Sequence, residues 1–353
     1  MKTKTVKIDE NRIDMDVIKE SGKVILEGGL VAFPTETVYG LGGDALNPDS
    51  SKKIYAAKGR PSDNPLIVHV AKWEDIARIT KNIPDSAKLL ADKFWPGPLT
   101  MIMNKSDEVP YETTGGLDTV AIRMPVHKTA LAFIEAAGGY VAAPSANISG
   151  RPSPTSSQYV IEDMDGRIDM IIDGGDVEIG LESTIVDLTG DVPTLLRPGY
   201  VTIEMLREVL GEVDIDKTII SGDSKEPPKA PGMKYRHYAP KGNLTIISGD
   251  SDDVVEYINK ATLAAVVEGA KVGVIATDET KAAYSADSVK SVGSRYDEAS
   301  IAHMLFRILR EFDDEQVAVI FSESFNMGGI GQAIMNRLLK AAGHQVVELK
   351  PQK

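Results

Sequence analysis

The sequence has no cysteine, no long hydrophobic run and no excess of positive charge. Without cysteine, the chain has no disulfide bond, no thiolate nucleophile and no zinc or iron–sulfur centre held by thiolates. This composition fits a reducing cytoplasm, which is the expected location. Among 353 residues, 39 lysines and arginines oppose 52 aspartates and glutamates, so the formal net charge is −13. Proteins that grip a nucleic-acid backbone over a broad face usually carry a basic excess, so this balance argues against a primary nucleic-acid binder.

The hydrophobic residues are distributed as in a globular protein. No run reaches the roughly 18 apolar residues of a membrane-spanning helix, and the first residues lack the apolar segment of a secretory signal. We therefore expect neither a transmembrane helix nor a signal peptide. Apolar residues make up 42% of the chain and charged residues 26%, so it can form buried cores. Its length predicts two domains, or one large one.

Several common catalytic motifs are missing as well. The P-loop pattern and the G-x-S-x-G elbow are absent, and the five histidines never take the i, i+4 spacing of a metal-binding helix. Residues 40–45 match G-x-G-x-x-A, but Arg60 stands where a dinucleotide-binding fingerprint has an acidic residue. These glycines indicate a turn, with the backbone close to a ligand or to a neighbouring strand.

One segment separates two acidic parts of the chain. Residues 225–242 contain four prolines and two glycines, which predicts an extended linker. The net charge is +3 over residues 221–242, against −11 for residues 1–220 and −5 for residues 243–353. The linker is either a plain spacer or a strap whose basic, aromatic run 235–238 docks on something anionic.

The part after the linker alternates β-branched strands with helices, which predicts a small parallel, doubly wound sheet. The expected strands are 244–247, 272–276, 289–292, 317–321 and 345–349, and the expected helices are 252–268, 301–312 and 331–342.

The part before the linker is less regular, and we expect an α+β or mixed α/β domain with more loop than a standard Rossmann unit. The expected strands are 30–33, 66–70, 99–103, 119–123, 140–143, 170–173, 183–187 and 194–196, and the expected helices are 50–57, 85–94, 128–137 and 202–210.

A cationic pair follows the first of these helices. Residues 51–60 sum to +4 inside a strongly acidic domain, and they end on Lys58 and Arg60. Cations at a helix end complement its dipole, which is the ordinary explanation. That explanation fits Arg60 poorly, because Arg60 lies beyond the helix and before a proline that holds it extended. With Ser62 and Asn64 nearby, its guanidinium resembles a polyphosphate grip.

Polar residues also follow two apolar strands. Ser145, Asn147, Ser149 and Ser153 lie just after one strand, either as a simple turn or as a ligand-binding strand end. Arg123 ends another strand that is otherwise apolar. It is either paired with a buried carboxylate or available for the carboxylate of a ligand.

Together these motifs resemble a known family. The K-x-R pair at Lys58 and Arg60 and the S-x-N pair at Ser145 and Asn147 are similar to the signature tetrad of the YrdC-domain family. The segments FPTETVYGL, RPSDNPLIVH, FWPGPLT, VAIRMP and ESTIVD fit the same family. The linker APGMKYRHYAP, followed by an α/β domain, resembles its longer, two-domain form. The resemblance covers essentially the whole chain.

The resemblance implies both a fold and a reaction. It implies a YrdC-like twisted mixed sheet with helices over residues 1–220, a linker over 221–242 that closes over the active site, and a Rossmann-like domain over 243–353. It implies an adenylate-forming nucleotidyltransferase that condenses L-threonine, bicarbonate and ATP to L-threonylcarbamoyl-adenylate and pyrophosphate. The product would serve the threonylcarbamoyl-adenosine modification of tRNA beside the anticodon.

The resemblance also implies cofactors and partners. Mg²⁺ is expected with the ATP phosphates, and no metal ligand is expected from protein side chains. A separate transferase complex would take the product to tRNA, so neither tight direct tRNA binding nor membrane binding is expected. The oligomeric state stays open.

Site residues follow from the resemblance by position, with Lys58, Arg60, Ser145 and Asn147 as the catalytic set. The ATP-binding set is Lys58, Arg60, Ser62, Thr119, Ser145, Asn147, Ser153, Arg197 and Tyr235, and the threonine-binding set is Thr35, His69, Arg123, Ala143, Ser183 and Thr184. Two alternatives stay open. Thr35 and Ser183 can be strand-end hydroxyls bonded to backbone. The residues alone favour His69 as a satisfied core histidine.

A binding module is the competing function. A YrdC-type domain has a concave, locally basic surface, which would suit double-stranded RNA or tRNA in translation or ribosome assembly. Binding of that kind would depend steeply on salt.

Overall fold

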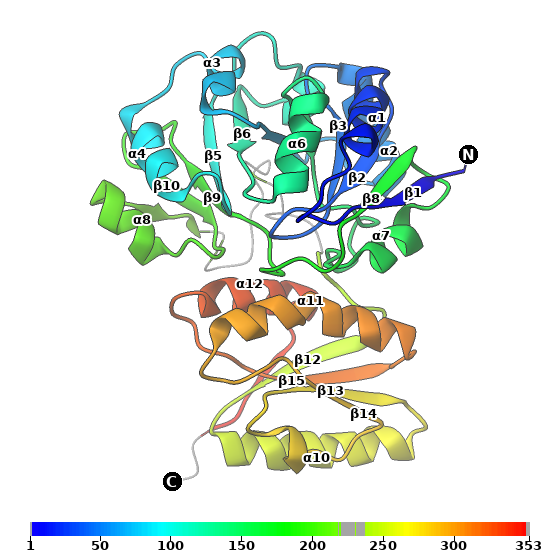
Figure 1. Cartoon of the computed structure of the whole chain (residues 1–353). Coiled ribbons are helices and arrows are strands. Elements are labelled where there is room, and N and C mark those ends of the chain that lie inside the picture. The colour runs from blue at the N-terminus through cyan, green and yellow to red at the C-terminus, as the bar shows by residue number, and fades with distance from the viewer. Residues whose placement is uncertain (1, 218, 220–229, 231–236, 351–353) are drawn as a thin grey trace. The chain divides into compact units, whose positions relative to one another are not determined.

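Figure 1 shows the computed structural model, which describes residues 2–217, 219, 230 and 237–350. The chain forms two compact units. The first comprises Met1–Ser149 and Ser153–Tyr235, and the second comprises Gly150–Pro152 and Arg236–Lys353. The short segment Gly150–Pro152 thus belongs to the second unit, although both of its chain neighbours belong to the first.

A mixed sheet of eleven strands forms the centre of the first unit, in the order β1-β8-β2-β3-β7-β4-β6-β5-β9-β10-β11. The strands are β1 (Lys4–Lys7), β2 (Val31–Phe33), β3 (Gly40–Asp44), β4 (Ile67–His69), β5 (Leu99–Asn104), β6 (Thr119–Arg123), β7 (Val141–Ala143), β8 (Met170–Asp173), β9 (Thr184–Asp187), β10 (Thr194–Arg197) and β11 (Asp214–Ile215). Parallel pairs such as β4 with β6 occur beside antiparallel pairs such as β5 with β6. The expected mixed sheet is confirmed.

Helices flank this sheet. They are α1 (Met15–Leu26), α2 (Pro48–Lys58), α3 (Ile76–Ile79), α4 (Asp85–Phe94), α5 (Tyr111–Thr114), α6 (Lys128–Ala136), α7 (Ser157–Met164) and α8 (Ile203–Leu210), with a 3₁₀ turn at Trp73–Asp75. The four predicted helices are confirmed as α2, α4, α6 and α8. Helix α2 begins as its sequence predicts, because the side chain of Asn47 accepts from the N–H of Asp49 and Pro48 occupies the first turn.

The sequence reasoning missed α1 and α7. Helix α1 is capped by Asp14, whose side chain accepts from the N–H groups of Asp16 and Val17. Its buried face includes Ile18 and Ile25, which lie seven residues apart among lysines and glutamates. Ser21 and Gly22 are buried between them, and a Cβ atom on Gly22 would lie 2.5 Å from the backbone of Ala136 in α6. Small residues therefore interrupt the apolar pattern where α6 packs against α1.

The glycine-rich stretch 40–45 contains a buried strand, β3, which pairs with β2 and β7. A Cβ atom on Gly42 would lie 2.8 Å from Cγ1 of Val141, so only glycine admits so close a neighbour. Of the two roles expected for these glycines, close approach to a neighbouring strand is confirmed, and the turn is wrong.

The two faces of the sheet pack differently. On one face, Val68, Met101 and Ile122 share a large core with residues from α2, α4, α7 and α8. On the other face, α1 and α6 cover β2, β7 and β8. Farther along that face lies a smaller apolar cluster, made by Ile67, Ile102, Ala121, Ile185, Leu196 and Ala230. Alternate residues of a strand face opposite sides, so Thr119 and Arg123 of β6 lie on the same face as Ala121.

The second unit is a five-stranded parallel sheet in the order β14-β13-β15-β12-β16. Its strands are β12 (Asn243–Ser248), β13 (Val272–Ala276), β14 (Ser288–Ser291), β15 (Val319–Glu323) and β16 (Val346–Glu348), and its helices are α10 (Ser251–Val267), α11 (Glu298–Asp314) and α12 (Gly331–Ala341), with a 3₁₀ turn at Lys281–Ala283. Helix α10 lies on one face of the sheet, and α11 and α12 lie on the other (Figure 1). The doubly wound parallel fold predicted for this part is confirmed.

Within the described residues, no helix is both long and apolar enough to cross a bilayer.

Candidate active site

Lys58 brings three of the four tetrad residues together. It is the last residue of α2, and only 1% of it is exposed. Its Nζ donates to the backbone carbonyls of Ser145 and Asn147, both at 2.5 Å, and lies 3.5 Å from Asn147 Oδ1. The Ser145 hydroxyl donates to the same Oδ1 at 2.6 Å, and the carbonyl of Lys58 accepts from the N–H of Ser149. The lysine therefore holds the start of the polar loop 145–153.

Arg60 differs from Lys58 in its surroundings. It follows Gly59, which takes the left-handed conformation with φ +62°, and its side chain is partly exposed. The guanidinium donates to the carbonyls of Asn64 at 3.3 Å and Pro65 at 3.1 Å. Both acceptors are neutral carbonyls close to Arg60 in the sequence, and they orient the guanidinium. Ser62, on the same loop, is exposed.

Strand register places these groups at one end of three neighbouring strands. Ile67 of β4 pairs with Ala121 of parallel β6 and with Ala143 of antiparallel β7. The start of β4, the start of β6 at Thr119 and the end of β7 therefore share one edge of the sheet. Arg60, bonded to Pro65 just before β4, and Ser145, just after β7, lie at that edge. Arg123 ends β6 and so lies at the opposite end of that strand.

Arg123 is bound to a buried carboxylate. Its Nη2 donates to Glu36 Oε1 at 2.5 Å, Nη1 to the hydroxyl of Thr37 at 2.8 Å, and Nε to the carbonyl of Gly97 at 3.3 Å. The side chains of Arg123 and Glu36 are 5% and 3% exposed. Of the two alternatives left open by the sequence, the buried carboxylate partner is therefore observed. Within the described part of the chain these bonds use three of the five N–H donors of a guanidinium.

Thr35 is joined to Arg123 through Thr37. Its hydroxyl donates to the carbonyl of Val38 at 2.7 Å and lies 2.9 Å from the hydroxyl of Thr37. It also accepts from the N–H groups of Thr37 and Val38, as in a threonine turn. The backbone-bonded alternative for Thr35 is therefore observed, and it occurs beside the Arg123 ion pair.

Ser183 forms a second group with Thr100 and Arg197. Its hydroxyl lies 2.7 Å from that of Thr100, and Arg197 donates to the Ser183 hydroxyl at 3.2 Å and to its carbonyl at 3.0 Å. Thr100 pairs in register with Arg123, so this group adjoins the ion pair. Arg197, expected on the nucleotide side, thus lies beside a residue of the threonine set.

Three other expected residues have defined surroundings. The Thr184 hydroxyl donates to the carbonyl of Val201 at 2.7 Å, so it serves a backbone contact. Ser153 is buried and donates to Glu182 Oε1 at 2.5 Å. Ala143 is buried on β7. Tyr235 lies outside the described residues.

His69 is a core residue. It is 4% exposed, its Nδ1 lies 3.1 Å from the carbonyl of Ile67, and its ring meets Phe33 edge-on at 5.9 Å. Burial, and secondarily the charge of Arg123, lowers the pKa of His69 to about 3. The imidazole is therefore neutral at physiological pH.

We expect His69 to make the protein less stable as the pH falls from 7 to 5. An unfolded histidine titrates near pH 6.5, whereas His69 in the fold stays neutral down to about pH 3. Between these values the unfolded state binds the extra proton, so the free energy of unfolding falls with pH, by at most about 1.4 kcal/mol per pH unit from this group. Urea unfolding of wild type and His69→Gln across this range measures the effect. The variant should show the flatter profile, and parallel profiles would contradict the assignment.

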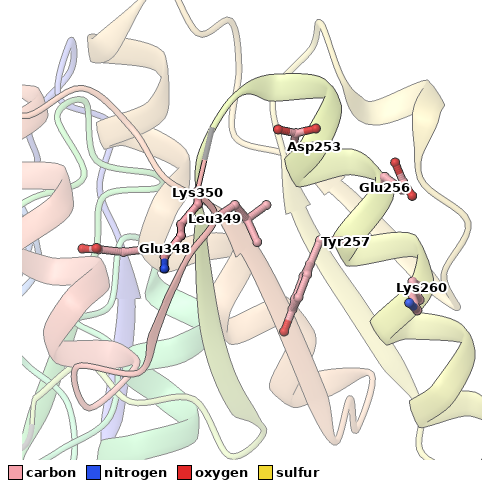
Figure 2. A pocket seen from close by; sticks show the side chains of 7 residues that line it. All are labelled: Asp253, Glu256, Tyr257, Lys260, Glu348, Leu349 and Lys350. Carbon is pink, nitrogen blue, oxygen red and sulfur yellow. The ribbon is translucent and has the colours of Figure 1, made fainter. Parts of the chain in front are cut away.

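Cavities occur in both units. In the first unit, a cavity of about 350 Å³ borders the Arg123 ion pair, because Glu36 and Gly97 line it together with Trp95 and Tyr200. Figure 2 shows a cavity of about 460 Å³ in the second unit, between α10 and the chain after β16. Its lining residues are Asp253, Glu256, Tyr257, Lys260, Glu348, Leu349 and Lys350. None of the expected site residues in the described ranges lines this second cavity. Over the same ranges, no cluster of three or more histidine, aspartate or glutamate residues could hold a metal ion.

Known proteins match both units. Residues 23–199 match the Sua5, YciO and YrdC family model, described as telomere recombination, and residues 201–343 match the threonylcarbamoyl-AMP synthase C-terminal domain. Curated threonylcarbamoyl-AMP synthases from Pyrococcus abyssi and Bacillus subtilis are each 48% identical to this chain. They cover 96% of it, and the alignments cover 97% and 96% of those proteins. The chain belongs to the threonylcarbamoyl-AMP synthase family.

A solved structure from the threonylcarbamoyl-AMP synthase family supports the fold at full length. The crystal structure of Pyrococcus abyssi Sua5 complexed with L-threonine matches with a TM-score of 0.94 and 47% identity, over 99% of this chain and 100% of that one. The fold of this threonylcarbamoyl-AMP synthase family member is therefore similar to that of the solved relative.

Four polar residues of this synthase-family site were not predicted from its sequence: Glu36, Thr37, Thr100 and Glu182. Each bonds an expected residue from a distant part of the chain or from a neighbouring turn. Glu36 had one available signal, since it is the only charged residue between positions 28 and 43. A lone carboxylate in so apolar a stretch is usually paired.

Proposed function

We propose that this chain condenses L-threonine, bicarbonate and ATP to L-threonylcarbamoyl-adenylate and pyrophosphate. The main support is family membership over nearly the whole length, together with the threonine complex of a relative with the same fold. In the reaction, the threonine amine adds to bicarbonate with loss of water and forms a carbamate. A carbamate oxygen then attacks the α-phosphorus, and the bond to the β-phosphate breaks. No covalent enzyme intermediate is required, so positioning and charge stabilisation carry the rate.

The phosphates would lie at the edge of the sheet where β7 ends and β4 begins. There Arg60 presents a partly exposed cation, with Ser62 and Thr119 at the same edge and with Ser145, Asn147 and Ser153 on the loop that follows β7. Mg²⁺ would be bound with ATP through its phosphates, and it would neutralise the charge of the leaving pyrophosphate. Lys58 has a different proposed role. Its ammonium faces backbone carbonyls, so it shapes the loop that receives the phosphates.

Threonine would bind near the Arg123 ion pair, which lies on the face of the sheet that also carries Thr119. Two of the N–H donors of Arg123 are not used by the bonds above, and they suit a carboxylate. Thr35 and Ser183 supply hydroxyls beside it, and Arg197 supports Ser183. His69, neutral and buried, would shape this pocket from beneath.

The linker is proposed to act as a strap over this face. Ala230 is fully buried in the apolar cluster with Ile67 and Ala121, which supports docking of the linker within the first unit. In the second unit, Tyr238 is 5% exposed, and its ring lies 4.9 Å from that of Phe306. A free spacer would bury neither side chain. A docked strap would shield the labile adenylate from water.

The product is proposed to pass to a separate tRNA-modifying transferase, with the cytoplasm as the expected compartment. The net charge of −13 agrees with an enzyme that need not hold RNA itself. Among the residues that the structure describes, no feature favours the RNA-binding alternative.

Pyrophosphate release tests the proposal directly. With purified protein and Mg-ATP, we expect release only when both threonine and bicarbonate are present, and we expect the threonylcarbamoyl-adenylate to appear by mass spectrometry. Reactions lacking one substrate serve as controls. Release that continues without threonine would mean simple ATP hydrolysis. A tRNA titration by calorimetry at physiological salt completes the test, since tight binding of tRNA without binding of ATP and threonine would favour the RNA-binding module.

A further inference from the structure

The loop after β7 contains a short piece of the second unit. Gly150–Pro152 belongs to the second unit, yet it interrupts the segment that carries Ser145, Asn147 and Ser153. Each of its three residues has its own contact with residues of the second unit.

Pro152 is held by a buried arginine. Arg310 of α11 is 1% exposed, and its Nε and Nη2 donate to the carbonyl of Pro152 at 3.0 and 2.6 Å. A buried guanidinium must have its donors satisfied, and hydrogen bonds from a charged donor are roughly twice as strong as neutral ones. Two donors of one planar group on one oxygen also fix the direction of that carbonyl.

The other two residues are held by neighbouring groups. The carbonyl of Gly150 accepts from the N–H of Ala239 at 2.8 Å. Nη2 of Arg151 lies 3.8 Å from Oδ2 of Asp313, a buried carboxylate one turn beyond Arg310. Asp313 also accepts from the N–H of Lys241 at 2.6 Å.

The backbone of this segment leaves little freedom for another conformation. Gly150 has φ +92°, a value in the region that favours glycine. Asn147 lies three residues before it. Ser153 follows Pro152 directly and is bonded to Glu182. A change in the direction of the Pro152 carbonyl would therefore rotate the peptide that leads to the Ser153 side chain.

We propose that Arg310 is a positioning residue for the 145–153 loop, acting through the carbonyl of Pro152. The loop is held at its start by Lys58, in its middle by Arg310 and at its end by Glu182. Arg310 makes no proposed contact with substrate and acts through the Pro152 carbonyl. The kinetic consequence rests on the proposed function, whereas the structural consequence does not.

Arg310→Met tests the proposal, with Arg310→Lys as a milder variant that keeps the buried charge. Displacing a binding group by about 1 Å can cost 10²-fold, so we expect Arg310→Met to raise the KM for ATP at least about tenfold. The KM for threonine should change less than about twofold. Hydrogen exchange of a peptide spanning residues 145–153 should become faster, while peptides from β4 and β6 stay unchanged. For Arg310→Lys we expect a KM for ATP and a loop exchange rate between those of wild type and Arg310→Met, because an ammonium lacks the planar fork of a guanidinium.

Arg307→Met is the matched control, since Arg307 lies on the same helix with its side chain 42% exposed and paired with Glu311. It should leave both KM values and the exchange of the loop at wild-type levels. Unchanged loop exchange in both Arg310 variants would overturn the proposal, as would equal loss of affinity for both substrates. If wild type released no pyrophosphate, the proposed function would fail, and the exchange measurement would still decide the role of Arg310.

Discussion

Arg60→Ala is expected to lose pyrophosphate release by about 10²–10³-fold while its unfolding free energy falls by only about 1 kcal/mol. The kinetic loss reflects removal of one cation from the site where charge develops on the leaving phosphates. The small loss of stability reflects its surroundings, because the side chain is partly exposed and its bonds to Asn64 and Pro65 are to neutral carbonyls. Steady-state pyrophosphate release and urea unfolding measure the two effects.

Arg167→Ala is the matched control for that experiment. Arg167 is exposed, and its guanidinium lies 3.4 Å from the carbonyl of Ala57, at the same end of α2. Its removal should leave the rate within about twofold of wild type. If Arg60→Ala also kept its rate, the edge at β4 and β7 would not be where the phosphates bind.

Lys58→Met is expected to lose both stability and activity. The ammonium satisfies the buried carbonyls of Ser145 and Asn147, and leaving buried polar groups unsatisfied costs about 1–3 kcal/mol each. For two carbonyls we therefore expect the free energy of unfolding to fall by about 2–6 kcal/mol. Activity should fall at least about 10²-fold, because the loop that carries Ser145 and Asn147 loses its anchor. Urea unfolding and pyrophosphate release measure the two losses.

Lys53→Met separates this effect from a general loss of charge on α2, since Lys53 is exposed on that helix and donates to the carbonyl of Gly28. It should keep near-normal activity and stability. A Lys58→Met protein that was inactive but as stable as wild type would mean that the ammonium contacts substrate and contributes little to holding the loop. The contrast between the Arg60 and Lys58 variants thus distinguishes a cation that binds substrate from one that builds the site.

Local patterns predicted the second unit well. Its strands and helices alternate with clear periods, and each expected element is found within a few residues of its place. The first unit was harder to predict. In helix α1 the buried positions between Ile18 and Ile25 are the small residues Ser21 and Gly22, and β3 is rich in glycine, so neither element has an apolar side chain at every buried position. Both elements depend on neighbours that are distant in the sequence.

The site was predictable by residue type but not by partner. The sequence pattern identified Arg123 as a candidate and left two partners open, a buried carboxylate of the protein or the carboxylate of a ligand. In the structure Arg123 is paired with Glu36, which lies 87 residues away in the sequence. Lys58 and Arg60 looked alike in the sequence, as two cations across one glycine. They differ because one points toward the end of β7 and the other toward the start of β4.

The sequence by itself determined the family, the acidic balance, the alternation of the second unit and the residue types of the site. These properties depend on amino-acid composition, on the spacing of apolar residues and on short sequence motifs. Only the tertiary structure decided that Lys58 is buried against backbone, that Arg123 is paired with Glu36 and that Gly150–Pro152 belongs to the second unit. A buried charge must find its partner wherever the fold brings one, and that place depends on packing between distant segments rather than on neighbours in the chain.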